Sequence, residues 1–243
     1  MFGKGISCRI TDNDVIQNSA VTSVVVPASV TLLGSYSFYG ALSLSHVTFY
    51  GNAPSGSDLF GSVAQNAKAI VLNTATGFGN TGDLYGGLTV IRVGGIYECL
   101  DDGATTGSGS FTVTRFVVTG STNCVGRAEI PFGTAEIADG AFEDSDLISV
   151  TIPSTVDSIG EDAFKQSSSL QHLTFMGSAP SEVGDDAFDG LDADVSGYQS
   201  ETATGFGDPG DLWNGITFVR IGGEYACTTD GLTEGSGTFT VAQ

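Results

Sequence analysis

The stretch IPSTVDSIGEDAFKQSSSLQHLTF, from Ile152 to Phe175, recurs in altered form elsewhere in the chain. Residues 130–152 read IPFGTAEIADGAFEDSDLISVTI, and residues 26–49 read VPASVTLLGSYSFYGALSLSHVTF. Each copy has a Phe near its middle and closes on alternating apolar residues, as one face of a short strand requires. A unit this short cannot bury its own apolar face. The repetition therefore predicts that neighbouring copies stack and share one core.

The spacing of the apolar residues defines the repeat. The pattern L-x-x-V-x-I at Leu147, Val150 and Ile152 returns downstream and upstream, and 22 residues separate Phe142 from Phe164. A period of ~20–29 residues with this spacing is that of leucine-rich repeats. The predicted core of the best copies consists of Leu147, Val150, Ile152, Phe164, Leu170, Leu173 and Phe175.

A longer phrase, IP-x-x-V-x-x-I-G-x-x-A-F, makes the match more specific. It is carried by Ile152, Pro153, Val156, Ile159, Gly160, Ala163 and Phe164. The phrase resembles the BspA-like leucine-rich repeats of bacterial and protist surface proteins, with one departure in the first copy, where Ser37 replaces the usual alanine. The resemblance covers roughly half of the chain. It implies an extracellular or cell-surface module for adhesion or interaction, without enzymatic activity.

A second, longer duplication overlies the repeat. The stretch GGLTVIRVGGIYEC at residues 86–99 matches NGITFVRIGGEYAC at residues 214–227, an offset of 128. Both alternate apolar and polar residues around Gly-Gly, as strands joined by a turn or bulge do. We therefore expect a mainly-β protein of leucine-rich-repeat solenoid modules, duplicated in tandem as residues 1–115 and 116–243. The β-hairpins and other β-rich segments would cap the modules or join them.

The charge balance excludes several classes of partner. The chain has 28 acidic and 8 basic residues, a formal net charge of -20, which disfavours nucleic acid and anionic lipid. The acidity serves solubility or attracts cations. No stretch approaches ~20 apolar residues, so we expect no membrane insertion. The start MFGKGISC lacks the apolar core of a signal peptide, which predicts either a removed export signal or a segment of a longer protein.

Two Gly-rich stretches and two histidines are candidate ligand sites in the sequence. GFGNTG at residues 77–82 and GFGDPG at residues 205–210 fit G-x-G-x-x-G, but the sequence after each is a poor helix, so we expect tight turns. His46 and His172 are equivalent positions just before core strand residues, and a metal site there would need further ligands nearby. We expect both histidines on an exposed strand face.

An acidic cluster in the second module is a candidate calcium site. Carboxylate and carbonyl oxygens from flexible loops are the ligands that Ca²⁺ prefers. The alternative is a solvated acidic face, since the loop pattern of an EF-hand is missing from the sequence. The candidate calcium ligands are Asp185, Asp186, Asp189, Asp192 and Asp194.

The four cysteines are regularly placed. Cys124 follows Cys99 by 25 residues across a predicted hairpin, and Cys8 precedes the first set of repeats much as Cys124 precedes the second. Free thiols would fit a cytosolic protein, whereas the family resemblance favours an oxidising exterior. We expect a disulfide between Cys99 and Cys124, and a second between Cys8 of one unit and Cys227 of its neighbour.

The repeat, together with what the family resemblance implies, leads us to expect a non-enzymatic structural or adhesive repeat protein without a cofactor. Its expected partners are copies of itself joined head to tail, or flanking repeats in a longer array, together with host or matrix proteins or glycans. The alternatives are a Ca²⁺-dependent module that binds protein or glycan, and a carbohydrate-active enzyme. No nucleophile elbow, zinc motif or phosphate loop is present in the sequence.

Overall fold

The computed structural model describes residues 20–208, 210–221, 223–226 and 238–241. The described residues form strands, turns and loops, without a helix, and so none that is long and apolar enough to cross a membrane. The chain divides into two compact units, Met1–Gly95 and Ile96–Gln243. Residues 96–115, which the duplication assigns to the first module, pack with the second unit through strand pairing. We describe the two units separately.

The first unit is built on a five-stranded sheet in the order β1-β2-β3-β5-β4. Its strands are β1 (Ser23–Val26), β2 (His46–Phe49), β3 (Lys68–Leu72), β4 (Leu84–Tyr85) and β5 (Leu88–Val93). β1, β2, β3 and β5 pair in parallel, so that Val26, Phe49 and Val71 lie side by side in successive coils. The short β4 turns back through Gly86 and Gly87 and pairs with β5 in the antiparallel direction.

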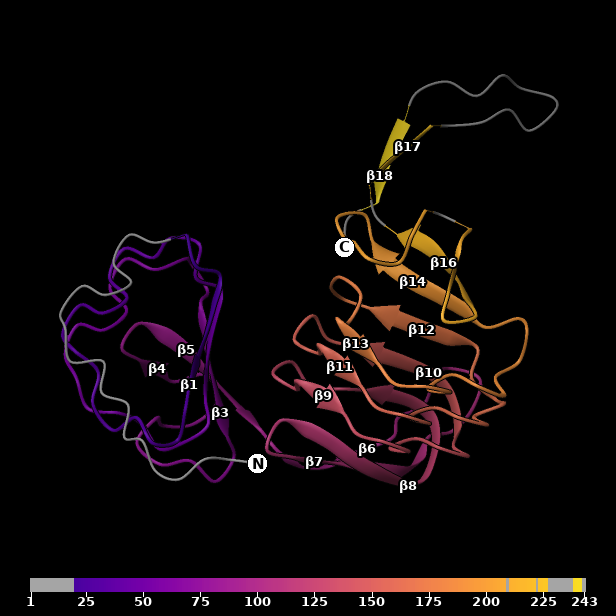
Figure 1. Ribbon diagram of the computed structural model, residues 1–243, viewed down its shortest axis with the longest axis horizontal. Coiled ribbons are helices and arrows are strands. Elements are labelled where there is room, and N and C mark those ends of the chain that lie inside the picture. Colours follow the sequence, from indigo (N-terminus) through magenta and orange to yellow (C-terminus); the bar gives the residue numbers. More distant parts are fainter. Residues whose placement is uncertain (1–19, 209, 222, 227–237, 242–243) are drawn as a thin grey trace. The chain divides into compact units, whose positions relative to one another are not determined.

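The second unit contains the same arrangement with more coils. Its main column of strands is β8 (Val117–Glu129), β10 (Asp146–Ile152), β12 (His172–Phe175), β14 (Ser196–Ser200) and β16 (Ile216–Ile221), closed by β15 (Leu212–Trp213). A second column pairs β9 (Glu136–Ile137), β11 (Ser158–Ile159) and β13 (Glu182–Val183). Figure 1 shows the arrows of β10, β12, β14 and β16 running in one direction, one above the other. This is the β-solenoid of stacked coils that the repeat predicts.

Strand β8 begins the stack of the second unit and pairs with strands of both columns. Its first residues, Val117 and Val118, pair with β9, and its last five pair with β10. On its other edge, β8 pairs with the antiparallel strand β7 (Ser108–Thr114), which also pairs with β6 (Gly95–Glu98). The β6–β7 hairpin and β8 together therefore cover the first edge of the stack.

The hairpin recurs near the end of the chain. β17 (Gly223–Ala226) and β18 (Thr238–Val241) pair in the antiparallel direction, at positions equivalent to parts of β6 and β7. Within the described residues this two-stranded sheet has no further strand, so no strand takes the place beside β18 that β8 takes beside β7.

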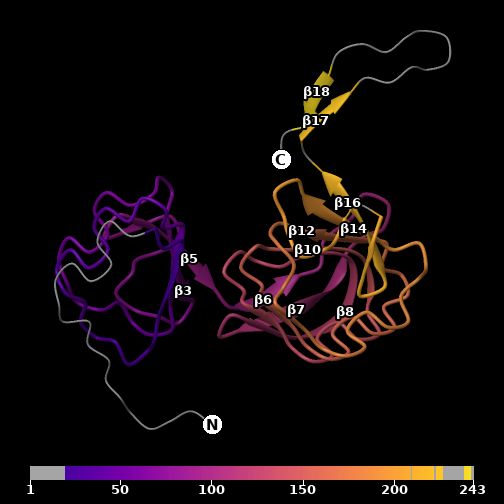
Figure 2. The same cartoon turned by 45° about the horizontal axis from the view of Figure 1, so that its top comes forward.

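A ladder of phenylalanines fills the interior of the coils. The rings of Phe142 and Phe164 stack at 5.2 Å, and those of Phe164 and Phe188 at 5.5 Å. Backbone hydrogen bonds hold each rung, because Phe142 N–H donates to the Ala163 carbonyl and Phe164 N–H donates to the Ala187 carbonyl. Figure 2 shows the turns of successive coils nested against one another in the second unit. All seven residues of the predicted core are buried.

An aromatic cluster closes the far end of each stack. In the second unit the Trp213 ring contacts Phe188 and Phe206, at centroid distances of 5.8 and 5.1 Å. In the first unit Tyr85 holds the equivalent place, 4.7 Å from Phe78. Burial raises the pKa of Tyr85 to about 12, and its hydroxyl donates to the Pro54 carbonyl. These clusters cover the last Phe of each ladder, Phe60 and Phe188, and directly precede the β-rich segments that were expected as caps.

Candidate functional site

Three of the five candidate calcium ligands lie on one turn of the second unit, just before and after Phe188. Their backbone groups belong to the stack, because the Asp185 carbonyl accepts from Asp162 N–H at 3.1 Å and the Asp189 carbonyl accepts from Gln166 N–H at 2.8 Å. These carbonyls are therefore used within the fold, and the carboxylates remain as the groups available to a ligand.

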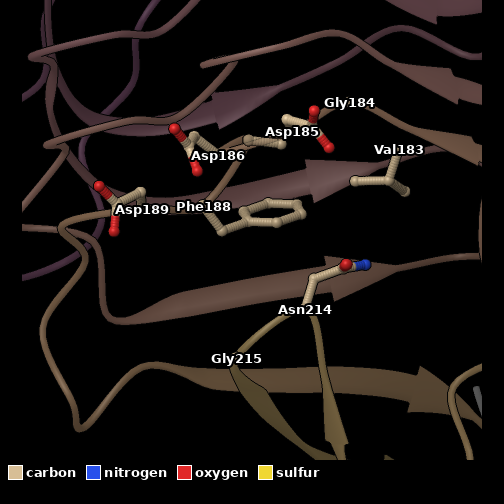
Figure 3. Close-up of a pocket in the computed structure, with 9 residues that line it drawn as sticks. Val183, Gly184, Asp185, Asp186, Phe188, Asp189, Asn214 and Gly215 are labelled. Carbon is tan, nitrogen blue, oxygen red and sulfur yellow. The ribbon is translucent and has the colours of Figure 1, made fainter.

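The carboxylates face a pocket of about 380 Å³ lined by residues 183–189, Asn214 and Gly215. Figure 3 shows the carboxylates of Asp186 and Asp189 on one side of this pocket and that of Asp185 farther away, near Gly184. The Phe188 ring lies between them and Asn214. The pocket is therefore acidic at its rim and aromatic at its floor.

A lysine offsets part of this charge. The Lys165 ammonium lies 2.8 Å from an Asp162 carboxylate oxygen and 3.7 Å from an Asp186 carboxylate oxygen. The hydrogen bond to Asp162, reinforced by the charges of Asp186 and Asp189, raises the pKa of Lys165. The Lys165 ammonium thus already offsets part of the negative charge at Asp186.

The remaining two candidate ligands belong to the next loop. The Asp192 carboxylate accepts from Asp194 N–H at 3.3 Å, which stabilises the turn. In the part of the chain that the structure describes, no three His, Cys, Asp or Glu side chains come together as a metal site would require. Calcium binding by Asp185 to Asp194 stays a prediction, tested by melting curves with millimolar Ca²⁺ and with chelator.

Acidic residues elsewhere also serve as turn caps. The Asp102 carboxylate accepts from the N–H groups of Ala104 and Thr105, at 3.0 and 2.6 Å. These hydrogen bonds, that from Thr105 first, lower the pKa of Asp102. Asp101 accepts from Gly107 N–H in the same loop. Hydrogen bonds to the backbone of their own loop therefore account for the presence of both carboxylates.

The Gly-rich stretches are tight turns, as predicted. Gly77, Gly79 and Gly82 all have φ between 85° and 92°, which favours glycine, and the turn carries the buried Phe78 into the core. The Asp83 carboxylate accepts from Asn80 N–H at 2.7 Å and closes the turn. The second copy repeats this with Asp211 and Asp208 N–H.

Sequence reasoning missed the residue that holds the first of these turns. The Arg92 guanidinium, from β5, donates to the carbonyls of Leu72, Asn73, Ala75 and Gly79, at 2.6–3.2 Å. Arg220 is its equivalent in the second module. The signal was the Arg that both copies keep between two apolar strand residues, in IRV and VRI.

The two histidines lie on the strands predicted, with different exposure. His172 is exposed and its ring lies 5.6 Å from that of Tyr198. His46 is half-buried, and burial, with a smaller effect of Lys68, lowers its pKa. The exposed position expected for both thus applies fully only to His172.

The structure contains a disulfide between Cys99 and Cys124, with Cα atoms 5.6 Å apart. It ties the loop after β6 to the middle of β8, and both cysteines are buried. The second predicted pair, Cys8 and Cys227, lies outside the described residues.

An apolar pocket of about 620 Å³ lies where β8, β10 and β12 end. Successive coils place Pro131, Pro153 and Met176 next to one another in register, and Tyr97 and Phe132 complete the lining. The Glu129 carboxylate at its rim is paired with Arg127 at 2.6 Å. Sequence reasoning did not identify this pocket, because its residues come from the turns of three different coils.

Comparison with known proteins agrees with this architecture. The model of the family described as the BspA type leucine rich repeat region matches residues 9–76 and 122–196, with six copies. No curated protein matches the chain.

Among solved structures, a leucine-rich repeat protein from Bacteroides ovatus is 19% identical over 86% of this chain and 44% of that chain, with a TM-score of 0.28. The chain thus spans less than half the length of that protein. The family model, in contrast, covers more than half of the 243 residues. The chain belongs to the BspA-type leucine-rich repeat family.

Proposed function

We propose that the chain is a non-enzymatic, exported repeat protein of the cell surface, with a structural and adhesive role, whose copies join head to tail. The observation that carries this proposal is the pairing of β8. This strand binds the β6–β7 hairpin on one edge and the parallel column on the other, and so joins a hairpin to the stack that follows it. A further hairpin of this type could be joined to a following stack by another strand that pairs as β8 does.

The hairpin of β17 and β18 supports such a joint. It repeats the pairing of β6 with β7, and among the described residues β18 pairs with β17 alone. At the other end of the repeats, β1 is the edge strand of its sheet among the residues that the structure describes, whereas the equivalent β10 is covered by β8. One added strand between β18 of one copy and β1 of the next would satisfy both edges with backbone hydrogen bonds.

In this assembly, the segment before β1 of one copy lies beside β18 of the previous copy, and Cys8 bonds to Cys227 across the joint. The Cys99–Cys124 disulfide is the model for this bond, and it also supports an oxidising location outside the cytosol. Because one end contacts a different end, the contact can repeat from copy to copy, and it builds a filament where the rotation between copies does not close a ring. The same joint within one longer polypeptide is the alternative.

A non-reducing gel of exported, oxidised protein tests the joint. We expect a ladder that collapses to one 24.8 kDa band on reduction. Cys227→Ser should abolish the ladder. The matched control, Cys99→Ser with Cys124→Ser, should keep it. A monomer in both lanes, with Cys8 and Cys227 alkylated as free thiols, would contradict assembly from separate copies.

A further inference from the structure

One position of the repeat requires an unusual backbone conformation in every coil. It is the residue two places before each ladder Phe, and its φ lies between 53° and 59° throughout. Its occupants are Tyr36, Asp58, Gly140, Asp162 and Asp186. Gly and Asp tolerate this left-handed region, whereas a bulky aromatic residue rarely adopts it. Tyr36 is therefore disfavoured by its own backbone, which points to a role for its side chain.

The Tyr36 side chain forms an exposed aromatic patch with Tyr39. The two rings meet edge to face at 5.8 Å, and the residues are 44% and 38% exposed. Aromatic rings that are exposed together on a protein surface mark an interaction site more often than isolated apolar residues do.

The next coil makes room for this patch. A Cβ atom at Gly61 would lie 2.7 Å from two atoms of the Tyr39 ring. Gly61 has no positive φ, so its backbone conformation does not require glycine. Glycine is required there because any side chain would collide with the Tyr39 ring. The equivalent residues of the second unit are Lys165 and Asp189, which carry long or charged side chains. The space that Gly61 leaves for the Tyr39 ring is therefore found only in the first unit among the described coils.

The surroundings of the patch are polar and carry little charge. The hydroxyls of Ser35 and Ser57 lie 3.0 Å apart beside Tyr36, and the exposed Asp58 occupies the same row in the next coil. In the second unit, the equivalent turns line two acidic pockets with the carboxylates of Asp139, Glu143, Glu161, Asp162, Asp185, Asp186 and Asp189. The two modules have therefore diverged at this surface, one into an acidic face and the other into an aromatic face.

We propose that Tyr36 and Tyr39 form a platform that binds a neutral sugar unit of a glycan. The face of an aromatic ring is negative, and the C–H bonds on one face of a sugar ring are weakly positive, so the two stack. The hydroxyls of Ser35 and Ser57 and the Asp58 carboxylate can exchange hydrogen bonds with the sugar hydroxyls.

Charge selects this ligand class over two others. A basic peptide would be drawn more strongly to the seven carboxylates of the second unit than to the single one here. An anionic sugar would be repelled by Asp58 and by the net charge of -20. The inference rests on the proposed adhesive role but is independent of head-to-tail assembly.

Binding of the intact chain to immobilised neutral polysaccharides, built of glucose, galactose, mannose or N-acetylhexosamine, tests the platform. We expect binding to at least one of them, weakened about tenfold by Tyr36→Ala or Tyr39→Ala through loss of ring contact. Tyr50→Ala, at an exposed tyrosine elsewhere in the first unit, is the matched control and should bind as the unchanged chain does.

Tyr36→Asp separates binding from structure. Because Asp suits the left-handed conformation, this variant should melt at a higher temperature and yet lose binding. Failure to bind any of the polysaccharides, or binding that Tyr36→Asp leaves unchanged, would overturn the proposal, as would a preference of the patch for a basic peptide. The gel ladder of the oxidised protein is read separately, so the failure of one proposal is distinguishable from the failure of the other.

Discussion

At the scale of single residues, the surroundings of each position in the repeat decide which side chains can be buried there. Ser37 illustrates this, because it replaces an alanine and is fully buried. Its hydroxyl donates to the Gly34 carbonyl at 2.6 Å, so the buried polar group is satisfied within its own turn. The Ser145 and Ser167 hydroxyls, 3.0 Å apart, are likewise satisfied across neighbouring coils. Substitutions at core positions are thus tolerated where a local hydrogen bond is available.

The Phe ladder should dominate the stability of the second unit. Phe164 is fully buried and its ring stacks on one neighbour from each side. We expect Phe164→Ala to lower the free energy of unfolding by ~3–5 kcal/mol, because it leaves a cavity between two rings. Chemical denaturation measures this. Met176→Ala, at a residue that is 58% exposed, is the control and should change stability little. A loss below about 1 kcal/mol for Phe164→Ala would contradict the stacked core.

Arg92 should stabilise the Gly-rich turn of the first unit. Removing its guanidinium takes away the donor of the Ala75 and Gly79 carbonyls, so Arg92→Ala should cost about 2 kcal/mol. Arg92→Lys should recover only part of this, because an ammonium cannot reproduce the planar fork of donors. Arg127→Ala, which removes a half-exposed ion pair with Glu129, is the matched control and should cost less than about 1 kcal/mol. Equal losses for Arg92→Ala and Arg127→Ala in thermal melts would contradict this role.

At the scale of elements, the strands of the main columns and the Gly-rich turns were predictable, whereas the second column of strands was not. The pattern at Leu147, Val150 and Ile152 identifies a strand because alternation reflects one buried face. The second column of strands escapes such reasoning, because pairs such as Ser158–Ile159 are too short to show a period. The role of Arg92 and the pocket beside Tyr97 were missed for another reason. The residues that meet there come from several coils, and the sequence of one coil does not show which residues of the next coil lie beside it.

The hairpin and β8 should depend on their disulfide. The bond between Cys99 and Cys124 closes a loop of 25 residues, so its removal should cost about 3 kcal/mol in the chain-entropy account. Mass spectrometry of a non-reduced digest identifies the pair, and denaturation of Cys99→Ser with Cys124→Ser measures its effect. Both thiols alkylated in an exported, oxidised sample would refute the pairing.

At the scale of the whole molecule, duplication explains why two units share one plan while their surfaces differ. The cores repeat because every coil must bury the same Phe and the same strand face. The turns are free of that demand, which is why one unit presents Tyr36 and Tyr39 where the other presents carboxylates. The family, the repeat and the tandem organisation could therefore be read from the sequence. The exposed aromatic patch could not, because its exposure depends on Gly61 in the following coil.

The central claim is that successive repeats stack in the register described, and engineered disulfides test it most directly. Val25 is the register partner of Thr48 in the first unit, and Thr151 is the partner of Thr174 in the second. We predict that Val25→Cys with Thr48→Cys, and Thr151→Cys with Thr174→Cys, each form a new intrachain disulfide on mild oxidation. The mass spectrum of a non-reduced digest would detect both.

The matched controls shift one partner by two residues along the same face of the strand. Ser23→Cys with Thr48→Cys, and Ser149→Cys with Thr174→Cys, should remain reduced, because a shift of about 6.6 Å along the strand exceeds the reach of a disulfide. In-register pairs that stay reduced, or shifted pairs that oxidise as readily, would contradict the stack.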